Sequence, residues 1–312
     1  MVSPLRSTLI ALSKSTRMQD LIVGMPISRR MARRFVAGET LPDAIGAIRA
    51  SNATGLLATL DFLGEHVHSE AEASVNADEY IRALHAIQEA GVDANISIKL
   101  TAMGLAVDDE FCYRNVRRIV EAAAQLGNFV RIDMEDTPVT DRTLAIYRRL
   151  RAEFPNTGVV IQAYLYRSEE DVRSLMAEGM AHLRLCKGAY DEPPAVAFQA
   201  KAEVDQSMTS LIRLMLDSQA EFPSTYPAIA SHDHRIINWV KAYAHHHGIA
   251  TDRFEFQMLY GIRRDLQQEL ADQGYRMRVY IPYGTRWYPY FMRRLAERPA
   301  NLLFFARALV GG

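Results

Sequence analysis

Residues 158–187 read GVVIQAYLYRSEEDVRSLMAEGMAHLRLCK, and this stretch contains the unit from which the fold can be inferred. An apolar run is followed by a segment with helical spacing that opens with capping chemistry at Ser168-Glu169-Glu170-Asp171 and ends before Gly179. A second apolar run then begins. A strand, a helix and a second strand in this order form a unit with parallel strands, which predicts a sheet covered by helices.

The same alternation runs along most of the chain. Eight apolar runs are typical of strands, at residues 55–63, 95–100, 129–135, 158–165, 183–187, 226–232, 254–259 and 276–283. Seven segments between them have helical spacing, at residues 78–90, 109–126, 141–153, 168–178, 196–218, 234–246 and 263–273. Eight buried strands with interleaved helices favour an α/β fold of the (βα)₈ TIM-like barrel type over an open sheet. The first run ends Leu63-Gly64-Glu65, which is no glycine-rich phosphate loop, so a dinucleotide-binding sheet loses its main support.

Length and composition agree with one large domain. The chain has 312 residues and is 49% hydrophobic, and a barrel of this type needs about 250 residues. Pro4, Pro26 and Pro42 indicate several short helices at the start. We therefore predict N-terminal helices over residues 1–50 and a catalytic barrel over residues 51–312.

Charge and cysteine content exclude several classes of protein. With 36 basic and 37 acidic residues, the net charge of −1 gives no general attraction to nucleic acid. The two cysteines, Cys112 and Cys186, suggest neither a disulfide framework nor a thiolate metal site, which favours a reducing, cytoplasmic compartment. No apolar run approaches the ~20 residues of a membrane span. The basic first 36 residues could be a transit peptide or a surface-binding helix, and we favour ordinary helices.

Polar side chains collect where the predicted strands end, which is where barrels of this type carry their active groups. Burying them unpaired would be costly, so we expect them to pair with one another or with a polar ligand. No order of Ser-His-Asp or Cys-His and no metal cluster is apparent, and the adjacent histidines at 245–247 splay apart. The set predicts a large anionic cofactor beside a small acid, and its members are Lys99, Asp133, Gln162, Arg184, Lys187, His232 and Gln257.

Residues 288–297, YPYFMRRLAE, predict a short helix with an anion clamp. Pro289 suits its first turn, and Tyr290, Arg293, Arg294 and Glu297 share one side because residues three and four apart face alike. Two adjacent guanidiniums can hold a carboxylate through planar, always charged forks. The alternative is a solvated helix with an internal Arg–Glu pair.

Three blocks of this sequence resemble the flavin-dependent proline dehydrogenases: RLCKGAY at 184–190, FEFQ at 254–257 and YFMRRLAE at 290–297. The pattern Tyr-x-x-Arg-Arg-x-x-Glu is that family's signature, and the resemblance runs from about residue 30 to the C-terminus. The chain is similar to the monofunctional bacterial enzymes and not to the long fusions with an aldehyde dehydrogenase. Cys186 stands where valine is common, Ser231 stands where threonine is common, and Asp191 follows Tyr190 where members vary.

The resemblance implies a distorted (βα)₈ barrel that binds FAD noncovalently. It implies oxidation of L-proline to Δ1-pyrroline-5-carboxylate by hydride transfer from C5 to flavin N5, the first step of proline catabolism to glutamate. It implies a membrane quinone as electron acceptor, and hence peripheral contact with the inner membrane face. It also implies that a separate pyrroline-5-carboxylate dehydrogenase could use the product as a partner enzyme.

The resemblance also assigns roles to individual residues. Asp133 and Arg184 lie at the reacting centre, with Arg184 beside flavin N5, and Asp133 either accepts a proton or only orients its neighbours. The implied substrate-binding residues are Lys99, Leu259, Tyr280, Arg293, Arg294 and Glu297. The implied cofactor-binding residues are Met134, Gln162, Arg184, Lys187, Gly188, Ala189, Tyr190, Ser231, His232 and Gln257. Tyr280 favours proline over hydroxyproline, because a smaller residue there would admit the hydroxyl.

Two rival functions remain open at this point. One is another flavin barrel, such as a methylenetetrahydrofolate reductase, which would use NAD(P)H. The other is a catalytically inactive barrel that acts as a binding protein.

Overall fold

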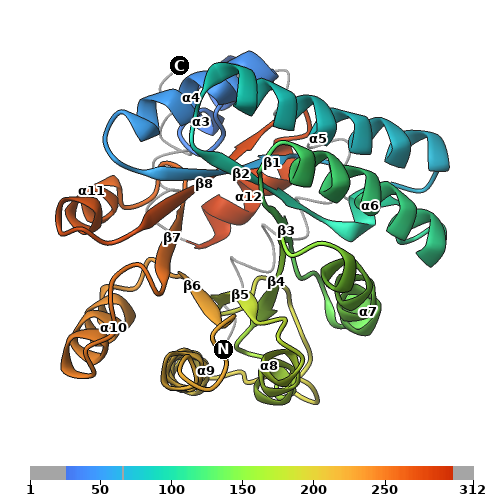
Figure 1. Cartoon of the computed structure of the whole chain (residues 1–312). Coiled ribbons are helices and arrows are strands. Elements are labelled where there is room, and N and C mark those ends of the chain that lie inside the picture. Colours follow the sequence, from blue (N-terminus) through green and yellow to red (C-terminus); the bar gives the residue numbers. More distant parts are fainter. Residues whose placement is uncertain (1–25, 65–66, 298–312) are drawn as a thin grey trace.

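Eight parallel strands close into a barrel in chain order (Figure 1). The computed structural model describes residues 26–64 and 67–297. The strands are β1 (Leu57–Phe62), β2 (Ala94–Ile98), β3 (Val130–Ile132), β4 (Thr157–Gln162), β5 (His182–Cys186), β6 (Tyr226–Ala230), β7 (Glu255–Leu259) and β8 (Met277–Tyr283). Strand β1 pairs with β8, with Thr59 opposite Tyr280, and this pairing closes the ring. The predicted barrel and its eight strands are confirmed.

Most of the helices surround the strands in Figure 1 and bury apolar residues in a core shared with them. The helices are α3 (Pro26–Ala32), α4 (Leu41–Asn52), α5 (Glu70–Ala90), the short 3₁₀ helix η1 (Leu100–Met103), α6 (Asp109–Gln125), α7 (Thr137–Glu153), α8 (Ser168–Ala177), α9 (Lys201–Asp217), α10 (His234–His246), α11 (Arg264–Asp272) and α12 (Tyr288–Glu297). None of the helices in these described ranges is both long and apolar enough to cross a membrane.

Two helices begin earlier than predicted. Helix α5 starts at Glu70, because Ser69 caps it by accepting a hydrogen bond from the backbone N–H of Glu72, and the polar first turns hid the helical spacing. Helix α7 starts at Thr137, because Pro138 is compatible with a first helical turn, where its missing N–H is not needed.

Helix α9 begins later than predicted, and the predicted capping by Ser168 is wrong. Residues 196–200 are not helical, because Ala197 forms an antiparallel bridge with Leu165 in the loop after β4. The hydroxyl of Ser168 is buried and donates to the carbonyl of Gln162 at 2.6 Å, so it serves the end of β4 instead of the helix.

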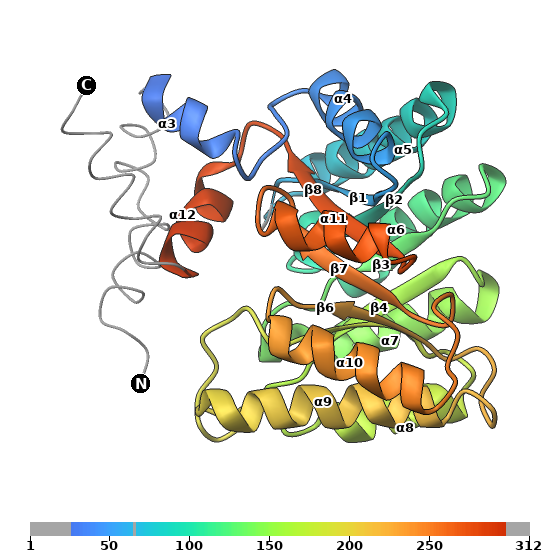
Figure 2. The same ribbon diagram turned by 90° about the vertical axis from the view of Figure 1, so that its left-hand side faces the viewer.

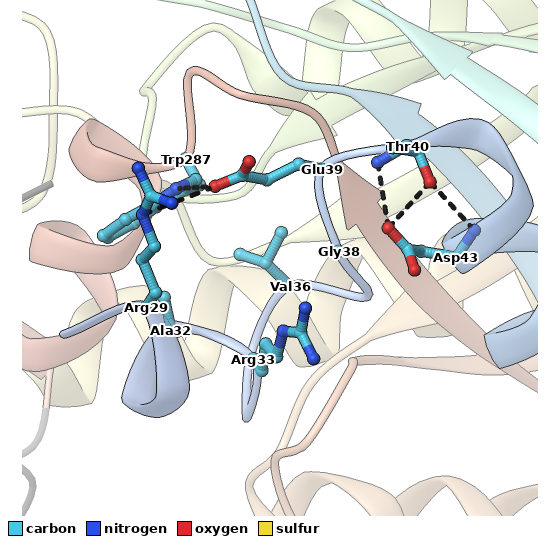
Figure 3. Close-up of a pocket in the computed structure, with 9 residues that line it drawn as sticks. All are labelled: Arg29, Ala32, Arg33, Val36, Gly38, Glu39, Thr40, Asp43 and Trp287. Atoms are coloured by element: carbon cyan, nitrogen blue, oxygen red, sulfur yellow. Dashed lines mark hydrogen bonds and ion pairs between the residues drawn. The ribbon is translucent and has the colours of Figure 1, made fainter. Parts of the chain in front are cut away.

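A second apolar cluster fixes α12 across the carboxyl end of the barrel. In Figure 2, α3 lies beside α12 at one end of the barrel. Phe35 packs on Phe291. The indole N–H of Trp287 donates to Glu39 at 3.2 Å, and Figure 3 shows these two side chains together. The N-terminal segment therefore seats the helix that carries the two arginines. The division of the chain at residue 50 stays a prediction.

Candidate functional site

A cavity of about 720 Å³ opens at the carboxyl ends of the strands, with α12 on one side. Its size is typical of sites for small ligands and cofactors. Every site residue predicted from the sequence lines it except Glu297, whose side chain lies outside the described part of the chain. The lining residues among those predictions are Lys99, Asp133, Met134, Gln162, Arg184, Lys187, Gly188, Ala189, Tyr190, Ser231, His232, Gln257, Leu259, Tyr280, Arg293 and Arg294.

The floor of the cavity centres on Asp133, directly after β3. Its carboxylate accepts hydrogen bonds from Ser97 Oγ at 2.6 Å, Arg184 Nη1 at 2.7 Å and the Tyr280 hydroxyl at 2.8 Å. Burial alone would raise the pKa of Asp133, but the charges of Lys99 and Arg184 more than offset it, and the pKa falls below its ordinary value. Asp133 is therefore an ionised acceptor and a weak base.

Lys99 is held by a residue that the sequence analysis missed. Its ammonium lies 3.0 and 3.1 Å from the two carboxylate oxygens of Asp61 and 3.2 Å from the Tyr280 oxygen. Asp61 is fully buried in β1, and burial raises its pKa despite the lysine. Asp61 is an acid in a mostly apolar strand, and it lies before the strand end, where the active groups of such barrels are expected.

Arg184 connects the floor to the deeper interior of the barrel. Its Nε donates to Gln257 Oε1 at 2.5 Å, and its guanidinium carbon lies 5.2 Å from the centre of the Tyr280 ring. Its Nη2 is buried and has no hydrogen-bond partner within the part of the chain that the structure describes. A buried cationic donor without a partner is costly, so it marks a position where a bound ligand would be stabilised.

The opposite wall is a loop held in place by Gln162. Its amide donates to the carbonyl of Glu135 at 2.8 Å and accepts from the backbone N–H of Ala189 at 3.0 Å. Gly188 has a positive φ of 133°, and a Cβ there would lie 2.5 Å from the Tyr164 ring. Only glycine fits, which lets the loop backbone pack closely against the Tyr164 ring.

The histidine at the end of β6 has a determined tautomer. His232 Nε2 accepts from the backbone N–H of Leu259 at 3.0 Å, so a neutral ring carries its proton on Nδ1. This contact joins the loops after β6 and β7 beside the cavity.

Two lysines and two aspartates form a charged cluster on the rim. Lys187 lies 2.5 Å from Asp205 and 3.0 Å from Asp233, and Lys201 pairs with the same two carboxylates. Lys201 also lines the cavity and was not predicted. Burial alone would raise the pKa of Asp233, but hydrogen bonds from Lys187 and from the backbone N–H of Arg235 lower it to about 2.

The rim cluster should contribute a stability that depends on pH. A carboxyl group with a lowered pKa stabilises the fold above its unfolded pKa near 3.8, and this contribution is lost as pH falls through about 2. For Asp233 it amounts to at most about 2 kcal/mol. We expect wild type to exceed Asp233→Asn in free energy of unfolding at pH 6, and most of this difference to be lost at about pH 2. Asparagine still caps α10, so a difference that stays constant in urea titrations across this range would contradict the assignment.

Comparisons with known proteins agree with this geometry. A family model described as proline dehydrogenase matches residues 44–307. Proline dehydrogenase 1 of Bacillus subtilis (strain 168) is 47% identical over 283 residues, which cover 91% of this chain and 92% of that protein. Proline dehydrogenase of Deinococcus radiodurans is 44% identical over 287 residues, covering 90% and 91% of the two chains.

A solved structure shares both fold and sequence similarity. Proline utilization A (PutA) from Bdellovibrio bacteriovorus, inactivated by N-propargylglycine, matches with a TM-score of 0.80 and 29% identity over 86% of this chain. The match spans only 33% of the PutA chain. The chain thus spans most of the monofunctional relatives and about a third of the longer protein.

Proposed function

The chain belongs to the proline dehydrogenase family, and on this premise we propose that it oxidises L-proline to Δ1-pyrroline-5-carboxylate with noncovalently bound FAD. One observation supports the proposal most strongly. The same cavity is lined by Arg293 and Arg294 of α12 and, on its floor, by Lys99, Asp133 and Arg184. This arrangement offers cations for a small acid beside donors for a larger anionic group.

The substrate would lie between α12 and the floor. Arg293 and Arg294 would bind the proline carboxylate through charge-assisted hydrogen bonds, with Lys99 as a third cation. Leu259 and the ring of Tyr280 offer apolar surface to the pyrrolidine ring. Such contacts hold the reacting carbon in one orientation, and orientation accounts for much of the rate in reactions of this kind.

The cofactor would be held along the other wall of the cavity. FAD, when bound, supplies the two-electron acceptor. The residues that would hold it are Met134, Gln162, Arg184, Lys187, Gly188, Ala189, Tyr190, Ser231, His232 and Gln257. The Nη2 of Arg184, which is unsatisfied among the described residues, and the polar donors along this wall fit a large polar group there.

Asp133 would orient its neighbours and would not accept the amine proton. Its carboxylate already receives three hydrogen bonds and has a lowered pKa, so it holds a proton poorly near neutral pH. Loss of hydride from C5 needs the lone pair of the ring nitrogen to stabilise the developing C=N bond. The reactive form of proline would therefore be the neutral amine.

The fate of the electrons follows from the family resemblance alone. We propose a membrane quinone as their acceptor, which requires peripheral contact with the cytoplasmic face of the inner membrane. A separate pyrroline-5-carboxylate dehydrogenase would take the product.

A visible spectrum tests the proposed function directly. The purified protein should be yellow, with the absorption of an oxidised flavin, and L-proline should bleach it under anaerobic conditions. Bleaching by NADPH and not by proline would favour the methylenetetrahydrofolate reductase alternative. A colourless protein that takes up no FAD would favour a binding protein.

A further inference from the structure

A buried glutamate below the cavity is connected to the site through two successive hydrogen bonds. Glu255 begins β7, is 3% exposed and does not line the cavity. Arg278 Nε donates to both of its carboxylate oxygens, at 3.0 and 3.2 Å, and the amide of Gln257 donates to one of them. Gln257 in turn accepts from Arg184 Nε.

The chemistry of Glu255 determines which way the Gln257 amide faces. Burial alone would raise the pKa of Glu255, but the charge and hydrogen bonds of Arg278 lower it overall, so the group is ionised. An ionised carboxylate only accepts hydrogen bonds. Gln257 must therefore present its NH₂ to Glu255 and its carbonyl oxygen to Arg184, an assignment that is usually ambiguous for an amide.

This polarity fixes the guanidinium of Arg184 at two points. Nε is bound to Gln257, and Nη1 is bound to Asp133 at 2.7 Å and Ser97 at 3.2 Å. A planar fork held at two positions has one orientation, which leaves Nη2 as its remaining donor. If the Gln257 amide reversed, its NH₂ would face Arg184 Nε and displace the fork.

We propose that Glu255 is a positioning residue that acts through Gln257 to set the orientation of Arg184 and to reserve Nη2 for the bound cofactor. The inference rests on the proposed function only in requiring that a flavin occupies the cavity. It assigns Glu255 a role in tuning the flavin, although Glu255 does not line the site.

Glu255→Asp is the most informative variant, because it keeps the charge beside Arg278 but shortens the side chain by one methylene, out of reach of Gln257. A less well oriented Arg184 stabilises the negative charge of reduced flavin less. We expect a tenfold weaker preference for the reduced state, which lowers the two-electron midpoint potential of the bound flavin by ~30 mV. The measurement is a spectroscopic redox titration. An unchanged or raised potential would overturn the proposal.

Glu255→Gln is a second variant, in which two effects on the midpoint potential oppose each other. Loss of a negative charge near the flavin by itself raises the potential, whereas loss of the fixed amide lowers it. The potential should therefore fall, but by less than in Glu255→Asp. This variant also serves if the aspartate variant fails to fold. A rise as large as the one that Glu255→Gln causes in a Gln257→Leu background would assign Glu255 only an electrostatic effect and would contradict positioning.

Two controls separate positioning from general loss of stability. Arg278→Lys should lower the thermal midpoint while leaving the potential within error of wild type, because Glu255 still faces Gln257. In a Gln257→Leu background, Glu255→Asp should cause no further fall in potential, because the connecting amide is absent. Additive falls would overturn the proposal. Failure of wild type to react with proline would refute the proposed function alone, since these potentials need only bound flavin.

Discussion

Replacing Arg293 with methionine should raise the KM for L-proline by roughly 10- to 150-fold while FAD stays bound. Methionine keeps an unbranched apolar stem but removes the guanidinium with its charge and its donors. A charge-assisted hydrogen bond contributes about 1.5 to 3 kcal/mol, and the KM range follows from that energy. Initial rates over a range of proline concentrations, with a visible spectrum of each sample, test the expectation.

Arg294→Met should have a similar effect on KM and an additional effect on stability. Arg293 is half-buried, whereas Arg294 is 8% exposed, with its guanidinium carbon 5.0 Å from the centre of the Tyr290 ring. Removing a buried, stacked guanidinium loses packing as well as charge. A lower thermal midpoint in Arg294→Met than in Arg293→Met is therefore expected.

The matched control is Arg264→Met, at the start of α11. Arg264 is exposed and does not line the cavity, so its loss should leave the KM for proline unchanged. If Arg293→Met left KM unchanged as well, or if it released FAD, the assignment of α12 as the carboxylate clamp would be wrong.

The sequence was sufficient for the barrel and for most of the cavity wall. Strand and helix periods are local, so the alternation from 158 to 187 could be recognised from spacing alone, and the rule that active groups follow strand ends then gathered Lys99, Asp133 and Arg184. The position of α12 over the barrel could not be predicted from local spacing. It depends on contacts of Phe35 and Glu39 with Phe291 and Trp287, which are distant in the chain.

The buried partners of the site could not be predicted from strand ends, because they arise from closure of the ring. Asp61 lies beside Lys99 and near Tyr280 because β1 pairs with β2, which precedes Lys99, and with β8, which carries Tyr280. Glu255 meets Arg278 across the β7 and β8 pair. Each is an acid in a strand made mostly of apolar residues, and a buried acid requires a cation nearby, so such residues indicate an interior pair even before the partner is known.

The largest loss of stability is expected for Lys99→Met. The side chain of Lys99 is 12% exposed and that of Asp61 is fully buried, so the variant leaves a buried carboxyl group without its cation. Removing one partner of a buried ion pair typically costs about 3 to 5 kcal/mol. Urea unfolding at one fixed FAD concentration, corrected for the Kd for FAD measured for each variant, should show this loss.

The double variant Lys99→Met/Asp61→Asn separates stability from substrate binding. Asparagine is neutral and of similar shape, and the Tyr80 hydroxyl, 3.2 Å from Asp61, remains to bond it, so most of the lost free energy of unfolding should return. The KM for proline should stay raised, because the ammonium proposed to face the carboxylate is still missing. Losses of stability that simply add in the double variant would show that Asp61 and Lys99 are not energetically paired. Recovery of KM together with stability would show instead that Lys99 supports the fold and does not bind the substrate.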